Sequence, residues 1–249
     1  LSGKTEAGQS RTFELVRGAP AEDGMVKAVK GDKALDLEMG DAEILRYHHA
    51  GVPLPDDLGR MPEAKRKLYA RSGFIHPLWS PAGTVMTDIH PPDHFHHMGL
   101  WMPWTHTRYE GKMVDFWNVG SGTGTVRFAD YLSTTDGPVY GAFQVEQEHI
   151  ARQTSKGEQV ILKEVWDVRA YNVGGPDEGY WLIDFKSTHR CVADEPLIQE
   201  EYRYGGFGYR GARQWKGDTA AYLTSEGKTR KDGHATRARW CDASGKIDQ

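Results

Sequence analysis

This sequence has few of the features that assign a function at once. Only two of its 249 residues are cysteines, Cys191 and Cys241, so the sequence allows either one disulfide or two reduced thiols. No apolar run reaches the roughly 18 residues that a membrane-spanning helix needs. The net charge is −4 and no long run of Lys and Arg occurs, so the basic footprint of a nucleic-acid-binding protein is missing. We therefore predict no membrane span and no nucleic-acid partner.

Motifs of several common enzyme classes are also missing. The sequence contains no G-x-S-x-G elbow for a serine nucleophile, and neither cysteine has the local signature of a nucleophile. The glycine-rich stretch Gly205–Gly208 lacks the spacing of a phosphate-binding loop. The sequence begins at Leu1 instead of methionine, which predicts that an N-terminal piece was removed. The compartment stays open, with a periplasmic or secreted location slightly favoured over the cytoplasm.

What the chain does have is a series of strand-like segments separated by turn residues. The segment Gly179–Cys191 alternates clearly, with Trp181, Ile183 and Phe185 on one face and charged residues between them. Long alternating strands without a βαβ rhythm predict an antiparallel β-sandwich with few or no helices, as a single domain. The expected strands are Thr12–Val16, Met25–Val29, Ala34–Leu37, Glu43–Tyr47, Gly124–Tyr131, Gly141–Arg152, Gln159–Tyr171 and Gly179–Cys191.

Histidines are concentrated in one loop-rich segment. Six of the eleven histidines lie between His76 and His106, and His90–His97 packs four imidazoles and the carboxylate of Asp93 into eight residues. Histidine titrates near neutral pH and is the commonest metal ligand, so the cluster indicates proton transfer or metal binding. Pro91 and Pro92 restrict the backbone and predict a stiff, preorganised loop.

Three interpretations of this cluster stay open. If the stretch Asp93–His97 is extended, His94 and His96 share a face and His97 points the opposite way. His94 and His96 would then offer two ligands to a divalent metal such as Zn²⁺ or Cu²⁺, completed by His90, His97, His76 or a distant carboxylate. Without a metal, the same side chains would act as acids, bases or hydrogen-bond donors to a substrate. In the third interpretation they only cap loops.

Aromatic and charged residues near the cluster are candidates for substrate binding. Trp101 and Trp104 would either wall a sugar pocket or belong to the core. Asp115 precedes another tryptophan, and the distant Arg210 is suited to hold hydroxyls or a carboxylate. Glu201 is a plausible base, although a surface ion pair on a glycine-rich turn explains the same stretch.

Six short motifs are spread from Arg71 to the end of the chain: Arg71–Leu78 (RSGFIHPL), Pro92–Trp101 (PDHFHHMGLW), Asp115–Trp117 (DFW), Gly205–Arg210 (GGFGYR), Thr224–Gly227 (TSEG) and Ala238–Gly245 (ARWCDASG). Together they resemble a bacterial family that is labelled "methane oxygenase PmoA" and is otherwise treated as a domain of unknown function. The string D-H-x-H-H-x-G-L-W is the specific part of the resemblance. Methane oxidation itself is not expected, because a membrane methane monooxygenase subunit needs several apolar spans.

The resemblance implies a β-sandwich protein of the galactose-mutarotase-like supersandwich type, encoded beside sugar-processing genes. Its H-x-G-L-W run is also weakly similar to the His-Gly motif of galactose-mutarotase-like enzymes, which use two histidines and a glutamate on a sugar. By role, His97 and His76 would be the acids and Glu201 the base. Members of the resembled family usually continue past the Asp-x-Ser-Gly region, so we expect a C-terminal part of the sandwich to be missing from this chain.

The leading hypothesis is a carbohydrate-active enzyme, an epimerase, lyase or glycoside-cleaving enzyme, that acts on a sugar or oligosaccharide. The alternatives are a metal-dependent hydrolase or oxygenase-like enzyme and a non-catalytic carbohydrate-binding module. The oligomeric state is open. The expected catalytic residues are His76, His94, His96, His97 and Glu201; the expected substrate-binding residues are Arg71, Trp101, Trp104, Asp115 and Arg210; and His94 and His96 are the candidate metal ligands.

Overall fold

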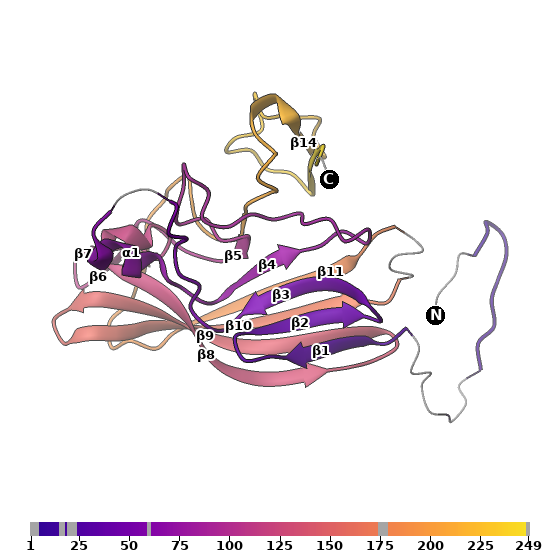
Figure 1. The fold of residues 1–249 in the computed structure, drawn as a ribbon, viewed down its shortest axis with the longest axis horizontal. Coiled ribbons are helices and arrows are strands. Elements are labelled where there is room, and N and C mark those ends of the chain that lie inside the picture. Colours follow the sequence, from indigo (N-terminus) through magenta and orange to yellow (C-terminus); the bar gives the residue numbers. More distant parts are fainter. Residues whose placement is uncertain (1–4, 15–17, 19–23, 59–60, 174–178, 248–249) are drawn as a thin grey trace.

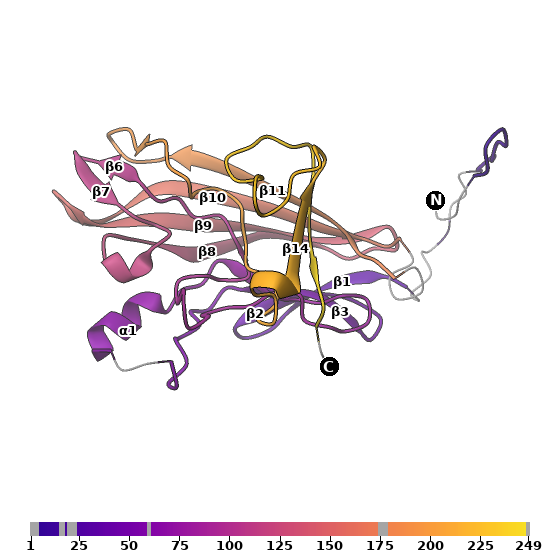
Figure 2. The same ribbon diagram turned by 90° about the horizontal axis from the view of Figure 1, so that it is seen from above.

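The computed structural model describes residues 5–14, 18, 24–58, 61–173 and 179–247, and antiparallel strands are its main regular structure. The two largest sheets lie one over the other, with β8–β11 in one layer and β1–β3 in the other (Figures 1 and 2). This arrangement confirms the predicted all-β sandwich.

The first layer is a six-stranded sheet with the order β1-β2-β3-β4-β5-β13. Its strands are β1 (Val26–Lys30), β2 (Ala34–Met39), β3 (Ala42–His48), β4 (Phe74–Leu78), β5 (Leu100–Trp101) and β13 (Gly208–Tyr209). The last three strands come from the segments RSGFIHPL, GLW and GGFGYR, which are far apart in the sequence. Pairing β4 with β5 and β5 with β13 therefore brings three of the sequence motifs side by side.

The second layer is a four-stranded sheet with the order β11-β10-β9-β8. Its strands are β8 (Gly124–Thr135), β9 (Tyr140–Thr154), β10 (Gly157–Tyr171) and β11 (Leu182–Cys191). These are the four long strands that the alternation predicts, with ends shifted by a few residues. In β11 the predicted alternation is confirmed, because Ile183 and Phe185 are half-buried while Asp184 and Lys186 are exposed.

The hydrophobic core fills the space between the two layers. Tyr47 of β3 packs edge-on against Trp166 of β10, with ring centroids 5.8 Å apart. Burying one such large side chain contributes roughly 1.5–3 kcal/mol, so this cluster is the main source of stability in the sandwich. The fully buried members of the cluster are Val26, Leu35, Leu37, Ile44, Leu45, Tyr47, Ile75, Phe143, Val145, Trp166, Val168 and Ala170.

Smaller elements surround the two layers. A three-stranded sheet joins β12 (Ile198–Gln199), β6 (Thr107–Tyr109) and β7 (Lys112–Val114), and a hairpin of β14 (Ala220–Thr224) and β15 (Cys241–Gly245) projects from the body (Figure 1). One short helix, α1 (Glu63–Tyr69), and two 3₁₀ turns, η1 (Val119–Ser121) and η2 (Gly217–Thr219), are the helical elements of the described residues. None of these helices is long and apolar enough to cross a membrane. Cys191 and Cys241 are both free and exposed.

One strand prediction is wrong. Thr12–Glu14 is not part of a strand, and the last two residues of the predicted strand Thr12–Val16 lie outside the described residues. Alternation alone does not make a strand, because a partner must supply the ladder hydrogen bonds, and Phe13 here is 51% exposed. The guanidinium of Arg11 lies over its ring, 5.0 Å from the ring centre.

Candidate functional site

The histidine loop between His90 and His97 folds as consecutive turns. The backbone N–H of His94 donates to the carbonyl of Pro91 at 2.9 Å, and that of His97 donates to the carbonyl of His94 at 3.0 Å. The stretch Asp93–His97 is therefore not extended, so the condition under which His97 would point away from His94 and His96 is not met. A turn replaces the strand because Pro91 and Pro92 cannot donate the hydrogen bonds of a ladder.

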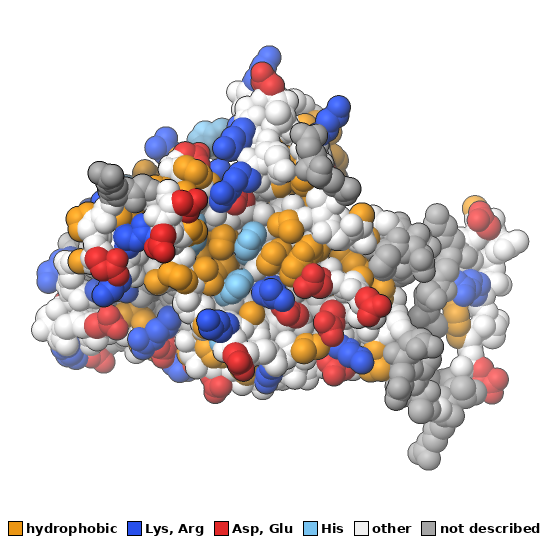
Figure 3. Space-filling view, viewed as in Figure 1, with side chains coloured by type: hydrophobic (Ala, Val, Ile, Leu, Met, Phe, Trp, Pro, Cys, Tyr) orange, Lys and Arg blue, Asp and Glu red, His pale blue; other side chains and the backbone are white. Residues whose placement is uncertain are grey.

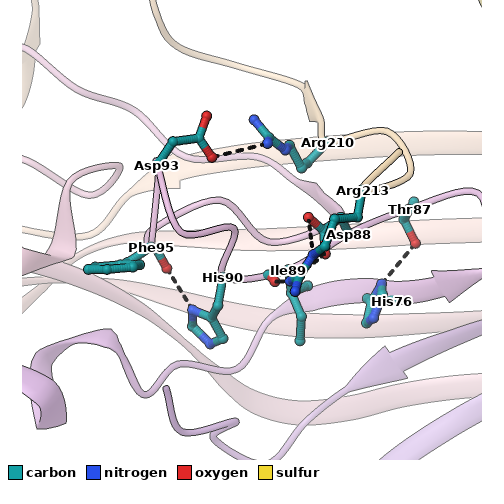
Figure 4. Close-up of polar contacts among 9 residues, drawn as sticks. All are labelled: His76, Thr87, Asp88, Ile89, His90, Asp93, Phe95, Arg210 and Arg213. Atoms are coloured by element: carbon teal, nitrogen blue, oxygen red, sulfur yellow. Dashed lines mark hydrogen bonds and ion pairs between the residues drawn. The ribbon is translucent and has the colours of Figure 1, made fainter. Parts of the chain in front are cut away.

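These turns bring three imidazole rings together. The rings of His94 and His97 stack with centroids 4.6 Å apart, and the ring of His96 stands edge-on to His97 at 4.7 Å. Asp93 holds the exposed His94 through a 2.9 Å contact to its Nδ1, and Arg210 reaches the same carboxylate at 3.3 Å. Arg210 thus anchors the loop, as the close-up in Figure 4 shows.

Burial keeps two of these imidazoles neutral. It lowers the pKa of His96 to about 4, and the charges of His94 and Arg71 act in the same direction. Burial, followed by the neighbouring His96 and His94, lowers the pKa of His97 to about 3. Both rings are therefore unprotonated at neutral pH and can accept a proton.

An aromatic cluster adjoins His97. The ring of His97 lies 5.3 Å from that of Trp101 and 5.9 Å from that of Trp117, and Trp117 stacks on Tyr204 at 5.7 Å. Trp101 is buried, whereas Trp117 is half-buried and Tyr204 is exposed. Trp101 therefore supports this cluster from behind, and Trp117 and Tyr204 form its accessible part.

His76 and His90 occupy a neighbouring network of polar contacts (Figure 4). Nδ1 of His76 lies 2.9 Å from Oγ1 of Thr87, and burial lowers the pKa of His76 to about 4. Nδ1 of His90 lies 2.6 Å from the carbonyl oxygen of Phe95, so this imidazole closes the loop. In the space-filling view, histidine side chains lie among hydrophobic ones near the middle of the face (Figure 3).

A second polar cluster lies on the inner face of the four-stranded sheet, and the sequence reasoning missed it. Glu164 of β10 is paired in register with Gln147 of β9 and with His189 of β11. Directly paired residues share one face of a sheet, as do residues two apart on a strand, so His149 and Ser187 join the same face.

The carboxylate of Glu164 is the centre of this cluster. Its Oε1 accepts hydrogen bonds from Nε1 of Trp166 and Oγ of Ser187, each at 2.5 Å. Its Oε2 lies 2.8 Å from Nε2 of His149, and Nε2 of His189 lies 3.3 Å from Oε1. Burial alone would raise the pKa of Glu164, but the hydrogen bonds from the two histidines lower it well below its usual range. Glu164 is therefore a buried, ionised carboxylate.

Arg71 connects the histidine loop with the Glu164 cluster. Its side chain is buried, and its Nη1 has no hydrogen-bond partner among the described residues. Burial lowers the pKa of Arg71 to about 10 although the charge of Glu164 opposes this, and the charge of Arg71 in turn acts on His96. The buried guanidinium of Arg71, which has an unpartnered N–H, therefore lies close enough to both His96 and Glu164 for its charge to act on them.

Other predicted site residues have more local contacts. Trp104 is half-buried and its Nε1 lies 3.3 Å from Nε2 of His189, which places it beside the Glu164 cluster. Asp115 accepts the backbone N–H groups of Trp117 and Asn118 at 2.9 and 2.7 Å and so shapes the turn that carries Trp117. Glu201 is exposed, and its role as a base stays a prediction.

Three residues of the described chain form a group that could hold a metal ion. The ligand atoms of His149, Glu164 and His189 lie within 4.8 Å of one another. No other group of three such ligand atoms meets this condition in the part of the chain that the structure describes. His94 and His96, with ring centroids 5.8 Å apart, are not part of it, and their assignment as metal ligands stays a prediction.

A surface hollow of about 540 Å³ lies elsewhere, beside the hairpin of β14 and β15. Its lining includes Gln214, Ala220, Ser244 and Lys246, with Asp218 as its one carboxylate and no histidine. This lining offers no group that titrates near neutral pH, in contrast to the two histidine-containing clusters.

Comparison with known proteins adds a family but no activity. A model of a family of unknown function, DUF6807, matches residues 34–249 and so includes both clusters. No curated protein and no solved structure matches the chain. The methane-oxygenase label is not part of the family description.

Proposed function

We propose that this chain, which belongs to the family of unknown function DUF6807, is a carbohydrate-active enzyme that uses neutral histidines for acid–base chemistry. The observation that carries the proposal is the contact between unprotonated imidazoles and accessible aromatic rings. His97, whose pKa is about 3, lies 5.9 Å from the ring of Trp117, which stacks on the exposed Tyr204. Aromatic faces bind the apolar faces of sugar rings, and the imidazole is then next to the bound ring.

The imidazoles of His96 and His97 are both unprotonated at neutral pH and are therefore available to accept a proton. An imidazole with a pKa of about 3 or 4 is a weak base, so removal of a proton also needs a group that stabilises the negative charge left on the substrate. The proposed step is removal of a C–H proton next to a carbonyl group, as in an epimerase or lyase, where a cationic donor can bind the carbonyl oxygen.

Arg71 is suited to stabilise the negative charge that this step creates. When a base removes a C–H proton next to a carbonyl, the electron pair moves onto the carbonyl oxygen. Arg71 is buried and its Nη1 is unpartnered among the described residues, so the guanidinium can donate to that oxygen. Removing one such donor from an enzyme site typically lowers kcat by about 100- to 1,000-fold.

Exchange of substrate protons with solvent tests the proposal. The purified chain is incubated in D₂O with a panel of keto sugars, uronic acids and oligosaccharides, and ¹H NMR follows deuterium incorporation and product formation. We expect His97→Gln and Arg71→Lys to lower the rate at least about 100-fold and Trp117→Ala to raise KM. His234→Gln, a change at an exposed histidine outside both clusters, is the matched control. Turnover that is unchanged in both His97→Gln and Arg71→Lys would disprove the proposal.

A non-catalytic carbohydrate-binding module is the second candidate, because the segment after β12 exposes several aromatic side chains. Tyr202, Tyr204 and Phe207 are 41, 46 and 52% exposed. However, Tyr202 stands edge-on to Tyr204, with an interplanar angle of 76°, so the rings do not form a flat row. Sugar binding that is constant from about pH 5 to 8 without product would favour this candidate.

A further inference from the structure

We propose that His149, Glu164 and His189 form a binding site for one divalent transition-metal ion, of the class to which Zn²⁺ belongs. The proposal is independent of the sugar chemistry at the histidine loop, because it concerns different side chains. It also differs from the metal pair His94 and His96 that the sequence predicts, which lies in the loop and not on the sheet.

The ligands come from three neighbouring strands of one rigid sheet. His149 on β9, Glu164 on β10 and His189 on β11 direct their ligand atoms to a common point, all within 4.8 Å of one another. Two imidazoles and one carboxylate make an open metal site, in which a fourth position is left for water or substrate. The imidazole nitrogens favour Zn²⁺, Cu²⁺ or Fe²⁺ over Mg²⁺ and Ca²⁺, which prefer oxygen ligands.

The two carboxylate oxygens of Glu164 have different partners. Trp166 and Ser187 both donate to Oε1 and fix the orientation of the carboxylate. Oε2 instead lies 2.8 Å from Nε2 of His149, so it faces the ligand nitrogen. Nε2 of His189 lies 3.3 Å from Oε1, so the two imidazoles contact different oxygens of the carboxylate. Hydrogen-bond donors such as Trp166 and Ser187 are the means by which an outer shell orients a metal-binding carboxylate.

Metal binding at Nε2 of His149 moves the imidazole proton to Nδ1. Nδ1 is buried and has no partner among the described residues, so this N–H reduces the free energy gained when the metal binds. The cation then replaces the single contact between Nε2 and Glu164, because both atoms bind it.

The charge around the site predicts an additional anionic ligand. Glu164 supplies one negative charge, and the buried guanidinium of Arg71 lies within electrostatic reach of it. A divalent ion would leave two uncompensated positive charges in a buried place, which is costly unless an anion accompanies it. We therefore expect hydroxide or a small carboxylate at the open position. The side chain of His189, which is 22% exposed, provides access.

Zn²⁺ binding to tag-free protein tests the site. The protein is stripped with EDTA, dialysed and titrated with ZnCl₂ by calorimetry, and Co²⁺ absorption bands give a second readout. We expect one Zn²⁺ per chain. We also expect His189→Gln to weaken binding at least about 100-fold, because even outer-shell changes typically cost 10- to 100-fold. His234→Gln and the double variant His94→Gln/His96→Gln are the controls and should bind Zn²⁺ like the wild type. Added acetate should tighten wild-type binding.

Two outcomes would overturn the assignment. The first is wild-type affinity no higher than that of His189→Gln, with both proteins folded by circular dichroism. The second is loss of binding in His94→Gln/His96→Gln but not in His189→Gln, which would move the metal to the histidine loop. Glu164→Gln is a supplementary variant, and the partly exposed His189 is the primary one because its replacement disturbs the core less. Sugar turnover is not measured, so this result does not depend on the proposed function.

Discussion

Acid should destabilise this protein because His96 and His97 are neutral in the folded state. Burial lowers their pKa values to about 4 and about 3, whereas an unfolded histidine titrates near 6.5. Below pH 6.5 the unfolded chain therefore binds protons that the folded chain does not bind. The stabilising contribution of the two groups is complete above pH 6.5 and is lost as the pH falls from 6.5 toward 4 and 3.

The pKa differences set the size of the effect. Between about pH 7.5 and pH 4.5, each histidine would lower the free energy of unfolding by about 2.5 kcal/mol if fully shielded. Both side chains are only partly buried, so solvent screening roughly halves this figure. The pair should thus account for about 2 to 3 kcal/mol of the acid-induced loss.

Urea unfolding at the two pH values measures this loss. Other histidines with lowered pKa values, such as His76, contribute in the wild type as well, so a variant has to isolate the pair. The double variant His96→Gln/His97→Gln cannot take up these protons. Its free energy of unfolding should fall by about 2 to 3 kcal/mol less than that of the wild type over the same pH interval. Equal losses in the two proteins would refute the reasoning, because they would mean that the imidazoles titrate normally in the folded state.

Three further changes have defined outcomes. Glu164→Gln places an amide N–H₂ among groups that donate to the carboxylate, and should lower the free energy of unfolding by about 2 to 4 kcal/mol in urea melts. Gly99→Ala puts a Cβ against the carbonyl of Ile75 at a φ of +57°, and should lower the melting temperature by several degrees, whereas Gly40→Ala on an open turn should have a smaller effect. Because Cys191 and Cys241 are free and exposed, a maleimide should label both in the native protein without reductant, and mass spectrometry would count the labels.

The strands of the sandwich were predictable because their alternation repeats over many residues. In β8 to β11 one face must pack on the opposite layer, so hydrophobic and polar residues alternate with a period of two. The early segment Thr12–Val16 has the same composition, but no partner strand contacts Thr12–Glu14 in the described part of the chain. Local pattern therefore predicts a strand reliably only where a sheet is available to pair with it.

The histidine loop shows a different limit. Its composition predicted a gathering of imidazoles, but not which of them face one another, because turns have no fixed period. The alternation that places Ile183 and Phe185 on the inner face of β11 also places Ser187 and His189 there, two and four residues after Phe185. The sequence therefore predicts that His189 faces inward. It does not predict that His189 contacts Glu164, because that contact depends on the register between β10 and β11, which only long-range pairing sets.

The position of Arg71 explains why a site can form between the two layers. Arg71 precedes β4 of the six-stranded sheet, yet the residues after it are held by the other sheet. Ser72 Oγ accepts the backbone N–H of Phe128 at 2.9 Å, and Gly73, at a φ of +74°, packs so closely on Gln147 that a Cβ would clash. The contacts of Ser72 and Gly73 thus hold the backbone next to Arg71, and this places the guanidinium near Glu164. In the R-S-G motif, serine and glycine therefore position the arginine that lies between the two clusters.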